Sequence, residues 1–461
     1  MKPNIVFVLT DQWRGQAFGY AGDPNVRTPN IDLLAGRSVN LVNAVSVCPV
    51  CTPHRASLLT GRYPTTTGMF LNDLYLPSEE LCMAEILGQA GYDTGYIGKW
   101  HLDGHGRDSY IPPERRQGFD YWKVLECTHN YNESLYYAGD DPTKRKWNGY
   151  DAYPQTADAR AYIHDHAGGD KPFLLFVAYG GPHFPHDNAP EQLKALYPPD
   201  RIALRPNVPE GMADRARAEL QGYYAHCTAI DRCVGELCEA VAEAGVADDT
   251  IFVFTSDHGD MFGSQGKRPR RKQLPWDESV RVPFLLRFPA VGGDGRTVQT
   301  PITTPDILPS LLSLAGVPVP DTVEGEDLSG LFRDGDGPAD RAALFMCVAP
   351  FGAGDFKAYR GLRSSRYSYV RDSNSPWLLY DNQQDPHQRN NLIGRPDHAD
   401  LQAKLEAELQ SQLKRIGDGF PSKDEAILQW GYTVNASGEI PYCGEFRAQS
   451  PGSQPGEVCR F

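Results

Sequence analysis

The sequence predicts an α/β protein built on a large, mostly parallel β-sheet that is sandwiched between helices. Two observations lead to this fold class. Short apolar runs recur along the first 255 residues, and amphipathic stretches with helical spacing lie between them. Strands that are apolar on both faces are typical of parallel sheets, because helices cover each side. A third observation, a change of character near residue 340, predicts a smaller C-terminal domain.

Four apolar runs have the length and composition of buried strands. In chain order they are NIVFVL (4–9), TGYIG (94–98), PFLLFVAY (172–179) and TIFVFT (250–255). A nearly continuous apolar run suits a strand in the middle of a sheet that is covered on both faces.

Two of the stretches between these runs have the pattern of helices. The segment 77–91 offers Ser78 as an N-cap and Gly91 just past its end. A long helix is predicted over 213–244, followed by a glycine. One stripe of it is apolar at helical spacing and consists of Leu220, Tyr223, Cys227, Ile230, Val234, Leu237 and Val241, with Cys238 beside it. We interpret the cysteines of this stripe as core residues.

The C-terminal part has shorter strands with turn signals between them. Strands are predicted in ALFMCVAP (343–350), AYRGLRSSRYSYV (358–370) and PWLLYDNQ (376–383), and a helix over 397–417. We therefore predict a larger α/β domain over 1–340 and a smaller domain with antiparallel sheet and helix over 341–461. The last 40 residues are expected to be irregular and to wrap the surface.

The charge of the chain limits its partners. The 461 residues include 45 Lys and Arg against 59 Asp and Glu, a net charge of −14. This balance argues against nucleic acid or an anionic membrane as the main partner, although a local basic pocket for a small anion is compatible with it. The apolar start, residues 5–9, is shorter than the roughly 7–15 residues of a secretory signal. We therefore expect a cytoplasmic protein without a signal peptide.

Residues suited to metal binding or acid–base chemistry follow each of the four apolar runs. They are Asp11 and Gln12 after the first run, Lys99 and His101 after the second, His183 and His186 after the third, and Asp257, His258 and Asp260 after the fourth. In open parallel sheets, sites form beyond the carboxyl ends of the strands. Although these residues are far apart in sequence, we expect their side chains to meet at one edge of the sheet.

The stretch SVCPVCTPHRASLLTGR (46–62) contains two cysteines three positions apart. A redox pair usually opens a helix, but Cys48 precedes a proline, and a zinc site would need a second close pair. Cys51 adjoins an expected helix start, with Thr52 as N-cap and Pro53 as the first helical residue. A nucleophile there has backbone N–H groups beside it, which suit an anionic ester. We favour a role for Cys51 alone over the redox and zinc interpretations.

Two longer stretches, CTPHRASLLTGR (51–62) and GYDTGYIGKWH (91–101), resemble the two signatures of the formylglycine-dependent sulfatases, a family of the alkaline phosphatase superfamily. The segments GGPHFPH, SDHGDMFGSQG, KQLPWDESVRVPF and LYDNQQDPHQRNNL follow in the order of the family. The resemblance covers almost the whole chain and implies an alkaline-phosphatase-like fold and sulfate ester hydrolysis. It also implies that a maturation enzyme, an expected partner, oxidises Cys51 to formylglycine, and that Cys48 has no catalytic role.

The resemblance implies a cation site as well. Asp11, Gln12, Asp257 and His258 would hold a divalent cation, and Ca²⁺ is expected because a hard cation prefers oxygen ligands. Many sulfatases have an asparagine where this chain has His258, so Mn²⁺ and Mg²⁺ remain alternatives.

The resemblance assigns catalytic roles to six residues. Cys51, as formylglycine, supplies the nucleophile; Arg55 holds it together with the carboxylates of the cation site; Lys99 and Lys272 bind the sulfate; His101 assists the nucleophile and sulfate release; and His183 protonates the leaving oxygen. The ordinary pKa of histidine, near 6.5, suits the last duty.

Several other residues have both a functional and a structural interpretation. Asn72 and His186 are candidate substrate contacts, but an asparagine in a turn and a histidine in a loop also occur for structural reasons. The same alternatives apply to Asp260. The basic run 267–272 is expected to form a positively charged rim at the site.

The aromatic and polar segment 104–150 is the expected specificity loop, and it favours a sulfated carbohydrate over an aryl or choline sulfate. Two alternatives stay open: a phosphonate monoester or phosphodiester hydrolase of the same superfamily, and a ligand-binding homologue whose Cys51 is never converted. His54 and Gln265 depart from the usual residues of the family. The sequence is compatible with an oligomer as well as with a single chain.

Overall fold

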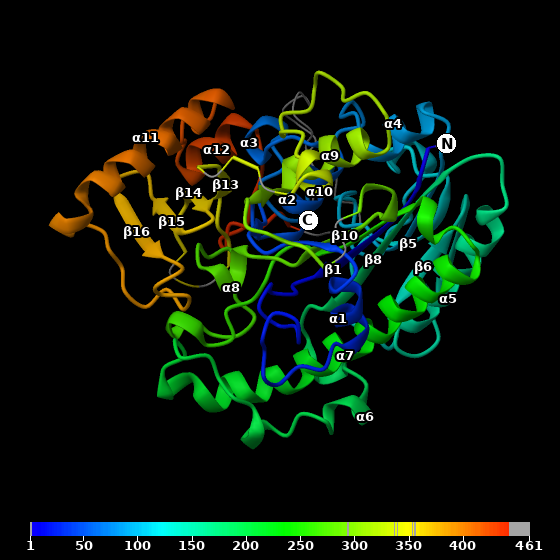
Figure 1. Cartoon of the computed structure of the whole chain (residues 1–461), viewed down its shortest axis with the longest axis horizontal. Coiled ribbons are helices and arrows are strands. Elements are labelled where there is room, and N and C mark those ends of the chain that lie inside the picture. Colours follow the sequence, from blue (N-terminus) through cyan, green and yellow to red (C-terminus); the bar gives the residue numbers. More distant parts are fainter. Residues whose placement is uncertain are drawn as a thin grey trace.

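The centre of the protein is a ten-stranded mixed sheet (Figure 1). The computed structural model describes residues 2–441 except 293, 294, 336, 339, 353 and 355. From edge to edge the strands are β11 (Thr297–Val298), β2 (Val39–Leu41), β10 (Phe284–Arg287), β9 (Thr250–Ser256), β1 (Asn4–Asp11), β8 (Phe173–Pro182), β4 (Asp93–Lys99), β5 (Tyr121–Leu125), β6 (Leu135–Ala138) and β7 (Asp141–Lys146). A small sheet pairs β3 (Ala44–Val45) with β12 (Ile302–Thr303).

The four predicted apolar strands are β1, β4, β8 and β9, and they are neighbours in the middle of this sheet. Strand β1 pairs in parallel with both β8 and β9, and β8 pairs in parallel with β4. Their carboxyl ends therefore lie side by side. This confirms the predicted fold class, and the antiparallel pairs β10–β9 and β5–β6 make the sheet mixed.

The helices cover both faces of the main sheet and also accompany the C-terminal strands (Figure 1). They are α1 (Pro29–Ala35), α2 (Cys51–Thr60), α3 (Pro64–Thr67), α4 (Met83–Gln89), α5 (Ala152–Ala167), α6 (Glu191–Lys194), α7 (Ala213–Glu243), α8 (Asp277–Val280), α9 (Ile307–Leu314), α10 (Gly330–Arg333), α11 (Ala399–Arg415) and α12 (Lys423–Gln429). Helices α1, α5 and α7 pack on one face, and α2, α4 and α9 pack on the other (Figure 1). Within the described part of the chain, no helix has both the length and the apolar character required to cross a membrane.

Strand β1 shows why these runs are apolar without interruption. Ile5, Phe7 and Leu9 point into the core that contains α2 and α9, whereas Val6 and Val8 point into the core that contains α7. All five side chains are fully buried. A strand between two cores has no solvent-exposed face, so polar and apolar residues do not alternate along its sequence.

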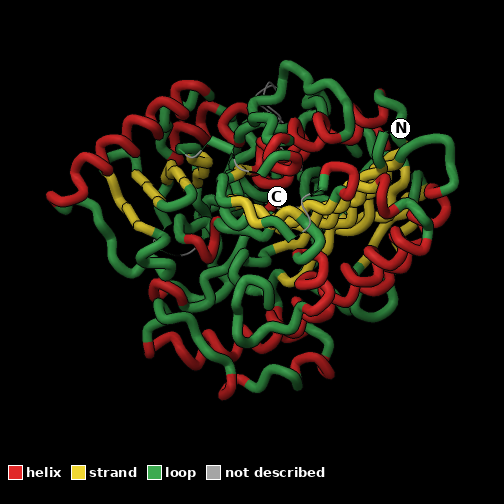
Figure 2. The backbone as a smooth tube through the Cα atoms, viewed as in Figure 1, coloured by secondary structure: helices red, strands yellow, loops and turns green. Residues whose placement is uncertain are grey.

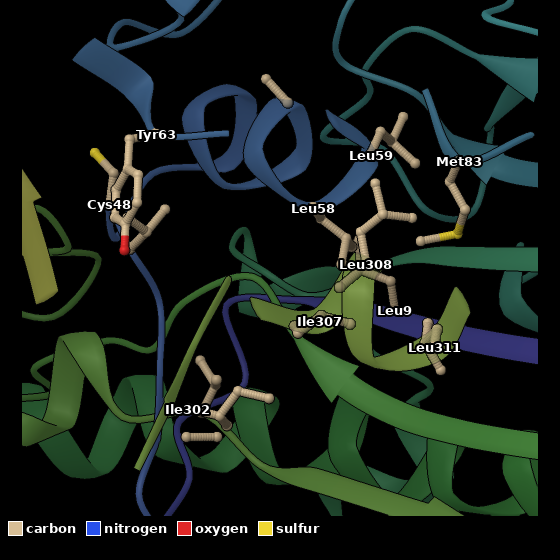
Figure 3. Packing of buried hydrophobic residues seen from close by; sticks show 14 of the residues in the cluster. Leu9, Cys48, Leu58, Leu59, Tyr63, Met83, Ile302, Ile307, Leu308 and Leu311 are labelled. Carbon is tan, nitrogen blue, oxygen red and sulfur yellow. The ribbon is translucent and has the colours of Figure 1, made fainter. Parts of the chain in front are cut away.

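Helix α2, which begins at Cys51, is held rigidly. All ten of its residues are buried, and Figure 3 shows its Leu58 next to Leu308 of α9. It ends at Gly61, which has a left-handed φ of 68° and donates from its N–H to the carbonyl of Ser57 at 2.9 Å. A side chain at Gly61 would also meet Val323 at 2.8 Å, so this helix end requires glycine.

The long predicted helix is confirmed as α7, with its apolar stripe buried. The helix predicted over 77–91 is shorter than expected. It begins at Met83 with Cys82 at the N-cap position, and the side chain of Glu85 accepts a hydrogen bond from the Cys82 N–H at 2.8 Å. Ser78 instead lies in hydrogen-bond contact with the Tyr75 hydroxyl, so the predicted N-cap is wrong.

The C-terminal part contains a separate antiparallel sheet of β13 (Ala342–Cys347), β14 (Tyr359–Ser364), β15 (Tyr367–Arg371) and β16 (Pro376–Asp381), followed by α11. These strands and this helix were predicted, and Figure 2 shows the second group of strands apart from the main sheet. The predicted domain boundary at 340 stays a prediction. The last 40 residues are not irregular throughout, because they include α12; residues 442–461 lie outside the described part.

The segment 104–150 is more ordered than the predicted loop. It contains β5, β6 and β7, which extend the main sheet at one edge. Their charged and aromatic residues obscure the strand pattern, because an edge strand such as β7 has exposed side chains.

Candidate active site

The carboxyl ends of the four central strands bring the predicted residues together. Asp11 ends β1, Lys99 ends β4, His183 follows β8, and Asp257 follows β9. Cys51, the first residue of α2, reaches the same point. One ligand-type atom each from Asp11, Cys51, Asp257 and His258 lies within 4.8 Å of the others.

The Cys51 thiol lies at the centre of this group and is only 1% exposed. Its Sγ is 3.0 Å from Lys272 Nζ, 3.3 Å from His258 Nε2 and 3.7 Å from Asp11 Oδ1. Burial raises the pKa of the thiol, but the positive charges of Lys272 and Lys99 outweigh burial and hold that pKa well below its ordinary value. The surroundings therefore favour a negative atom at this position.

The start of α2 differs from the prediction. The helix begins at Cys51 itself, and Thr52 is not the N-cap; its Oγ1 donates to the carbonyl of His101 at 2.8 Å. The Thr52 N–H is instead bound by Asn72 Oδ1 at 3.0 Å. The cap thus comes from a segment twenty residues further along the chain, which leaves Thr52 free to tie the helix to the end of β4.

Lys99 and Arg55 surround the Asp11 carboxylate. Lys99 Nζ lies 2.5 Å from Asp11 Oδ2, and Arg55 Nη2 lies 3.4 Å from the same oxygen and 3.5 Å from Asp257 Oδ2. Arg55 Nη1 also donates to the carbonyl of Lys99 at 2.9 Å. Burial would raise the pKa of Asp11, but Lys99 and the nearby histidines lower it far below its usual range. Arg55 therefore holds two carboxylates and the end of β4 in one arrangement.

The donor atoms fit a divalent cation. The Nδ1 of His258 lies 3.0 Å from the carbonyl of Gly259, which suits an Nδ1–H donor and leaves the Nε2 lone pair facing Asp11 and Asp257. Burial and the neighbouring Asp11 raise the pKa of Asp257 to about 6, the situation that a cation relieves. Gln12 Nε2 donates to Asp260, while its buried Oε1 has no hydrogen-bond partner among the described residues. Two carboxylates, an imidazole and an amide oxygen suit Ca²⁺, Mg²⁺ or Mn²⁺.

His101 is held by a carboxylate that the sequence reasoning did not single out. Its Nε2 lies 2.6 Å from Asp73 Oδ1, and Asp73 Oδ2 accepts a hydrogen bond from Arg107 at 3.1 Å. Burial opposes the charged imidazole, but Cys127 and the hydrogen bond of Asp73 raise the pKa of His101 to about 10. His101 is therefore a charged donor at the site.

The pKa of His183 is shifted in the opposite direction from that of His101. Its Nδ1 lies 2.7 Å from the carbonyl of Phe184, and its Nε2 lies 3.1 Å from Lys272 Nζ. Its ring is stacked on His129 at a centroid distance of 5.1 Å. Burial and the charge of Lys272 lower the pKa of His183 to about 4. Without an anionic ligand the ring is neutral, and a bound anion would raise its pKa.

Asn72 and His186 make hydrogen bonds to residues other than Cys51. Asn72 caps α2, as described above. His186 is buried, with its Nδ1 2.6 Å from Glu219 Oε2, while its Nε2 has no hydrogen-bond partner in the described part of the chain. Asp260 anchors Gln12 and accepts the N–H groups of Phe262 and Arg270 at 2.9 and 3.1 Å. A substrate contact for Asn72 or His186 stays a prediction.

The two residues that depart from the family pattern have structural partners. His54 is buried with its Nδ1 2.9 Å from Ser46 Oγ and 3.1 Å from Thr304 Oγ1. Burial lowers its pKa well below the ordinary value. Gln265 donates to the carbonyls of His387 and Gln388 at 3.0 and 2.9 Å. Both side chains connect segments around the site.

Comparisons with known proteins agree with this geometry. A family model described as Sulfatase matches residues 3–317, and one described as N-sulphoglucosamine sulphohydrolase, C-terminal, matches residues 270–415. The chain is 53% identical to an ulvan-active sulfatase of Formosa agariphila over 98% of this chain and 89% of that protein. It is 31% identical to an endo-4-O-sulfatase of Bacteroides thetaiotaomicron over 95% of both chains. A solved structure of a sulfatase from Bacteroides fragilis matches with a TM-score of 0.83 and 30% identity, over 91% of this chain and 97% of that one.

Proposed function

The chain belongs to the sulfatase family, and we propose that it hydrolyses sulfate esters of carbohydrates through a nucleophile made from Cys51, with a divalent cation bound beside it. One observation carries this proposal. The cysteine of a Cys-X-Pro-X-Arg motif starts a buried helix and faces two lysines, two histidines and a pair of carboxylates. That arrangement is suited to an anionic ester and has no evident structural purpose.

As formylglycine, the Cys51 side chain would be an aldehyde whose hydrate supplies an oxygen nucleophile to the sulfur. Arg55 would keep the side chain in place, since its guanidinium spans Asp11, Asp257 and the carbonyl of Lys99. The thiol Sγ stands in for the oxygen nucleophile, and Lys272 and His258 already lie near it.

Lys272 and Lys99 would bind the oxygens of the sulfate. Lys272 Nζ contacts Cys51 Sγ at 3.0 Å from the partly exposed side of the site, whereas Lys99 is held at the buried side by Asp11. The two charges flank the nucleophile, so an ester between them would be oriented and its negative charge compensated.

The two histidines would divide the proton transfers. Against the effect of burial, Cys127 and the hydrogen bond of Asp73 raise the pKa of His101 to about 10, so that it would be protonated at neutral pH and would hydrogen-bond to the nucleophile. His183 would bind its proton once the anionic ester is in place and pass it to the leaving oxygen. Opposite pKa shifts in one site are the pattern expected of separate acid and base roles.

Asp11, Asp257, His258 and Gln12 would hold the cation, with Ca²⁺ as the expected ion. The cation would lower the pKa of the nucleophile and neutralise the ester. The substrate proposal rests on the relative at 53% identity, so fragments of ulvan are the first carbohydrate to assay.

The test begins with the mass of the peptide that contains Cys51, from protein produced together with a formylglycine-generating enzyme. We expect a loss of about 18 Da at Cys51 and release of sulfate from ulvan oligosaccharides. Cys51→Ala should abolish release, and Cys238→Ala, a cysteine on α7 in the other core, should retain it. Sulfate release by the alanine variant at Cys51 would overturn the mechanism. Faster turnover of a phosphonate monoester or phosphodiester would overturn the substrate class.

A further inference from the structure

We infer that a cavity beside the active site binds the sugar ring next to the sulfated one; this rests on the proposed function. The cavity has a volume of about 230 Å³, and its lining includes Asn72, Asp73, Arg107, Phe351, Asn435 and Glu439. Pockets that enclose a drug-sized ligand measure roughly 300–1,000 Å³. This cavity is therefore suited to one ring of a larger molecule.

One wall of the cavity adjoins the nucleophile and the charged histidine. Asn72 Oδ1 accepts a hydrogen bond at 3.0 Å from the N–H of Thr52, the residue after Cys51. Asp73 Oδ1 lies 2.6 Å from His101 Nε2. A ligand that contacts Asn72 or Asp73 is therefore separated from the reacting atoms by a single residue, Thr52 or His101.

A second part of the lining, Phe351, is linked to Lys272 through Gln273. Both backbone groups of Phe351 are bound by the side chain of Gln273, at 2.9 Å for the N–H and 3.1 Å for the carbonyl. Gln273 directly follows Lys272, whose Nζ is 3.0 Å from Cys51 Sγ. Both parts of the lining are therefore linked through one or two residues to the same reacting centre, as expected of a cavity that receives the next ring of a bound saccharide.

The third wall comes from the C-terminal segment 435–441. The carbonyl of Ser437 accepts the N–H of Gly352 at 2.8 Å, which ties this segment to the Phe351 loop. Glu439 is half-buried, and its Oε2 accepts from Asn435 Nδ2 at 3.4 Å.

The lining is chemically suited to a sugar. It combines two amides, two carboxylates and a guanidinium with the half-buried ring of Phe351. Amides and carboxylates hydrogen-bond to hydroxyl groups as donors and acceptors, and an aromatic ring offers an apolar surface to the C–H face of a pyranose. Asp73 is paired with both His101 and Arg107, so its charge is compensated. The cavity therefore suits a hydroxyl-rich ring.

The experiment compares two substrates of the matured enzyme, ulvan oligosaccharides and the small ester 4-nitrophenyl sulfate. For Phe351→Ala and Glu439→Gln we expect the ratio of kcat/KM for the oligosaccharide to kcat/KM for the small ester to fall about tenfold, as the loss of one good contact implies. Glu408→Gln is the matched control. Glu408 lies on α11 and likewise accepts from an amide four residues away, Gln412, at 2.8 Å, but it is remote from the cavity lining. Its ratio should equal that of the wild type.

An unchanged ratio in both cavity variants would overturn the inference. If the wild-type enzyme hydrolyses neither ester, the proposed function fails, and the cavity is then tested by binding alone. Titration calorimetry of ulvan oligosaccharides into Cys51→Ala protein should show affinity that falls about tenfold when Glu439→Gln is added. Equal affinity of the two proteins would overturn the cavity as a sugar site.

Discussion

Two buried ion pairs set the charges of single residues at this site. Lys99 is paired with Asp11 and His101 with Asp73, at 2.5 and 2.6 Å. All four side chains are less than 10% exposed. Water cannot compensate a charge there, so each charge depends on the buried groups that surround it. This differs from the exposed pairs on the surface, which are worth little.

Replacing Lys99 should therefore destabilise the protein strongly. We expect Lys99→Met to lower the free energy of unfolding by about 3–5 kcal/mol, because it removes the nearest partner of the buried Asp11 carboxylate and leaves Arg55 farther away, at 3.4 Å. The measurement is urea unfolding in the presence of a chelator, so that no cation replaces the lost charge. Lys171→Met is the control. Its pair with Asp93 has side chains that are 64% and 41% exposed, and it should cost less than about 1 kcal/mol. Equal losses for the two variants would contradict this account.

The Asp73–His101 pair predicts a pH dependence of stability. The folded pKa of His101, about 10, lies above its ordinary value of 6.5, so the stabilisation is fully present below about pH 6.5 and is lost as the pH rises through 10. The destabilisation caused by Asp73→Asn should therefore be largest near pH 6 and shrink toward pH 10. Urea unfolding at several pH values measures it. A loss that is constant with pH would show that Asp73 does not act through the charge of His101.

At the scale of elements, the position of Cys51, the proposed nucleophile, depends on how α2 begins. The helix starts at Cys51 without a cap of its own, and Asn72 supplies the acceptor for the Thr52 N–H. An uncapped helix end would leave backbone N–H groups unpaired at the place where the ester is to bind. The central strands contribute the other half of the site, since parallel neighbours end at the same edge.

Variants of Asn72 can distinguish its role as the cap of α2 from a role as a substrate contact. Asn72→Ala should lower the free energy of unfolding by about 1 kcal/mol and reduce kcat, because the nucleophile is less firmly placed. Asn72→Asp retains an oxygen acceptor for the Thr52 N–H and should restore stability. Urea unfolding and steady-state kinetics of both variants provide the test. An increase in KM with unchanged kcat and stability would instead indicate a substrate contact.

At the scale of the whole molecule, the site joins segments from most of the chain. Asp11, Cys51, His101, His183, His258 and Lys272 come from six separate segments, and Gln273 links the site further to the loop between β13 and β14 of the C-terminal sheet. A bound cation would hold β1 and β9 together through Asp11 and Asp257. It binds the folded chain and not the unfolded one, so it must stabilise the fold.

Cation removal should therefore lower the melting temperature. At a concentration about a hundredfold above its Kd, a cation adds about 2.7 kcal/mol to the free energy of unfolding. We expect chelation to lower the melting temperature and Ca²⁺, Mn²⁺ or Mg²⁺ to restore it to different extents, which identifies the preferred ion. Asp257→Asn should abolish the response. A response that persists in Asp257→Asn would place the cation elsewhere.

The sequence by itself determined the strands of the central sheet, the long helix α7, the C-terminal strands and a group of candidate site residues that the fold brings together. Uninterrupted apolar runs mark strands covered on both faces, and parallel neighbours align their carboxyl ends, so Asp11, Lys99, His183 and Asp257 could be expected to meet. Cys51 and Arg55 could be predicted from their short motif, because its residues lie close together in the sequence.

Only the tertiary structure showed which other residues hold the candidate site residues in place. Asn72 caps α2, and Asp73 pairs with His101; neither contact leaves a pattern in the sequence, since the partners belong to different segments. The same reason explains the errors over Thr52, Ser78 and the segment 104–150. A side chain that could cap a helix finds another partner in the fold, and edge strands gain their order from the neighbouring strand and not from their own composition.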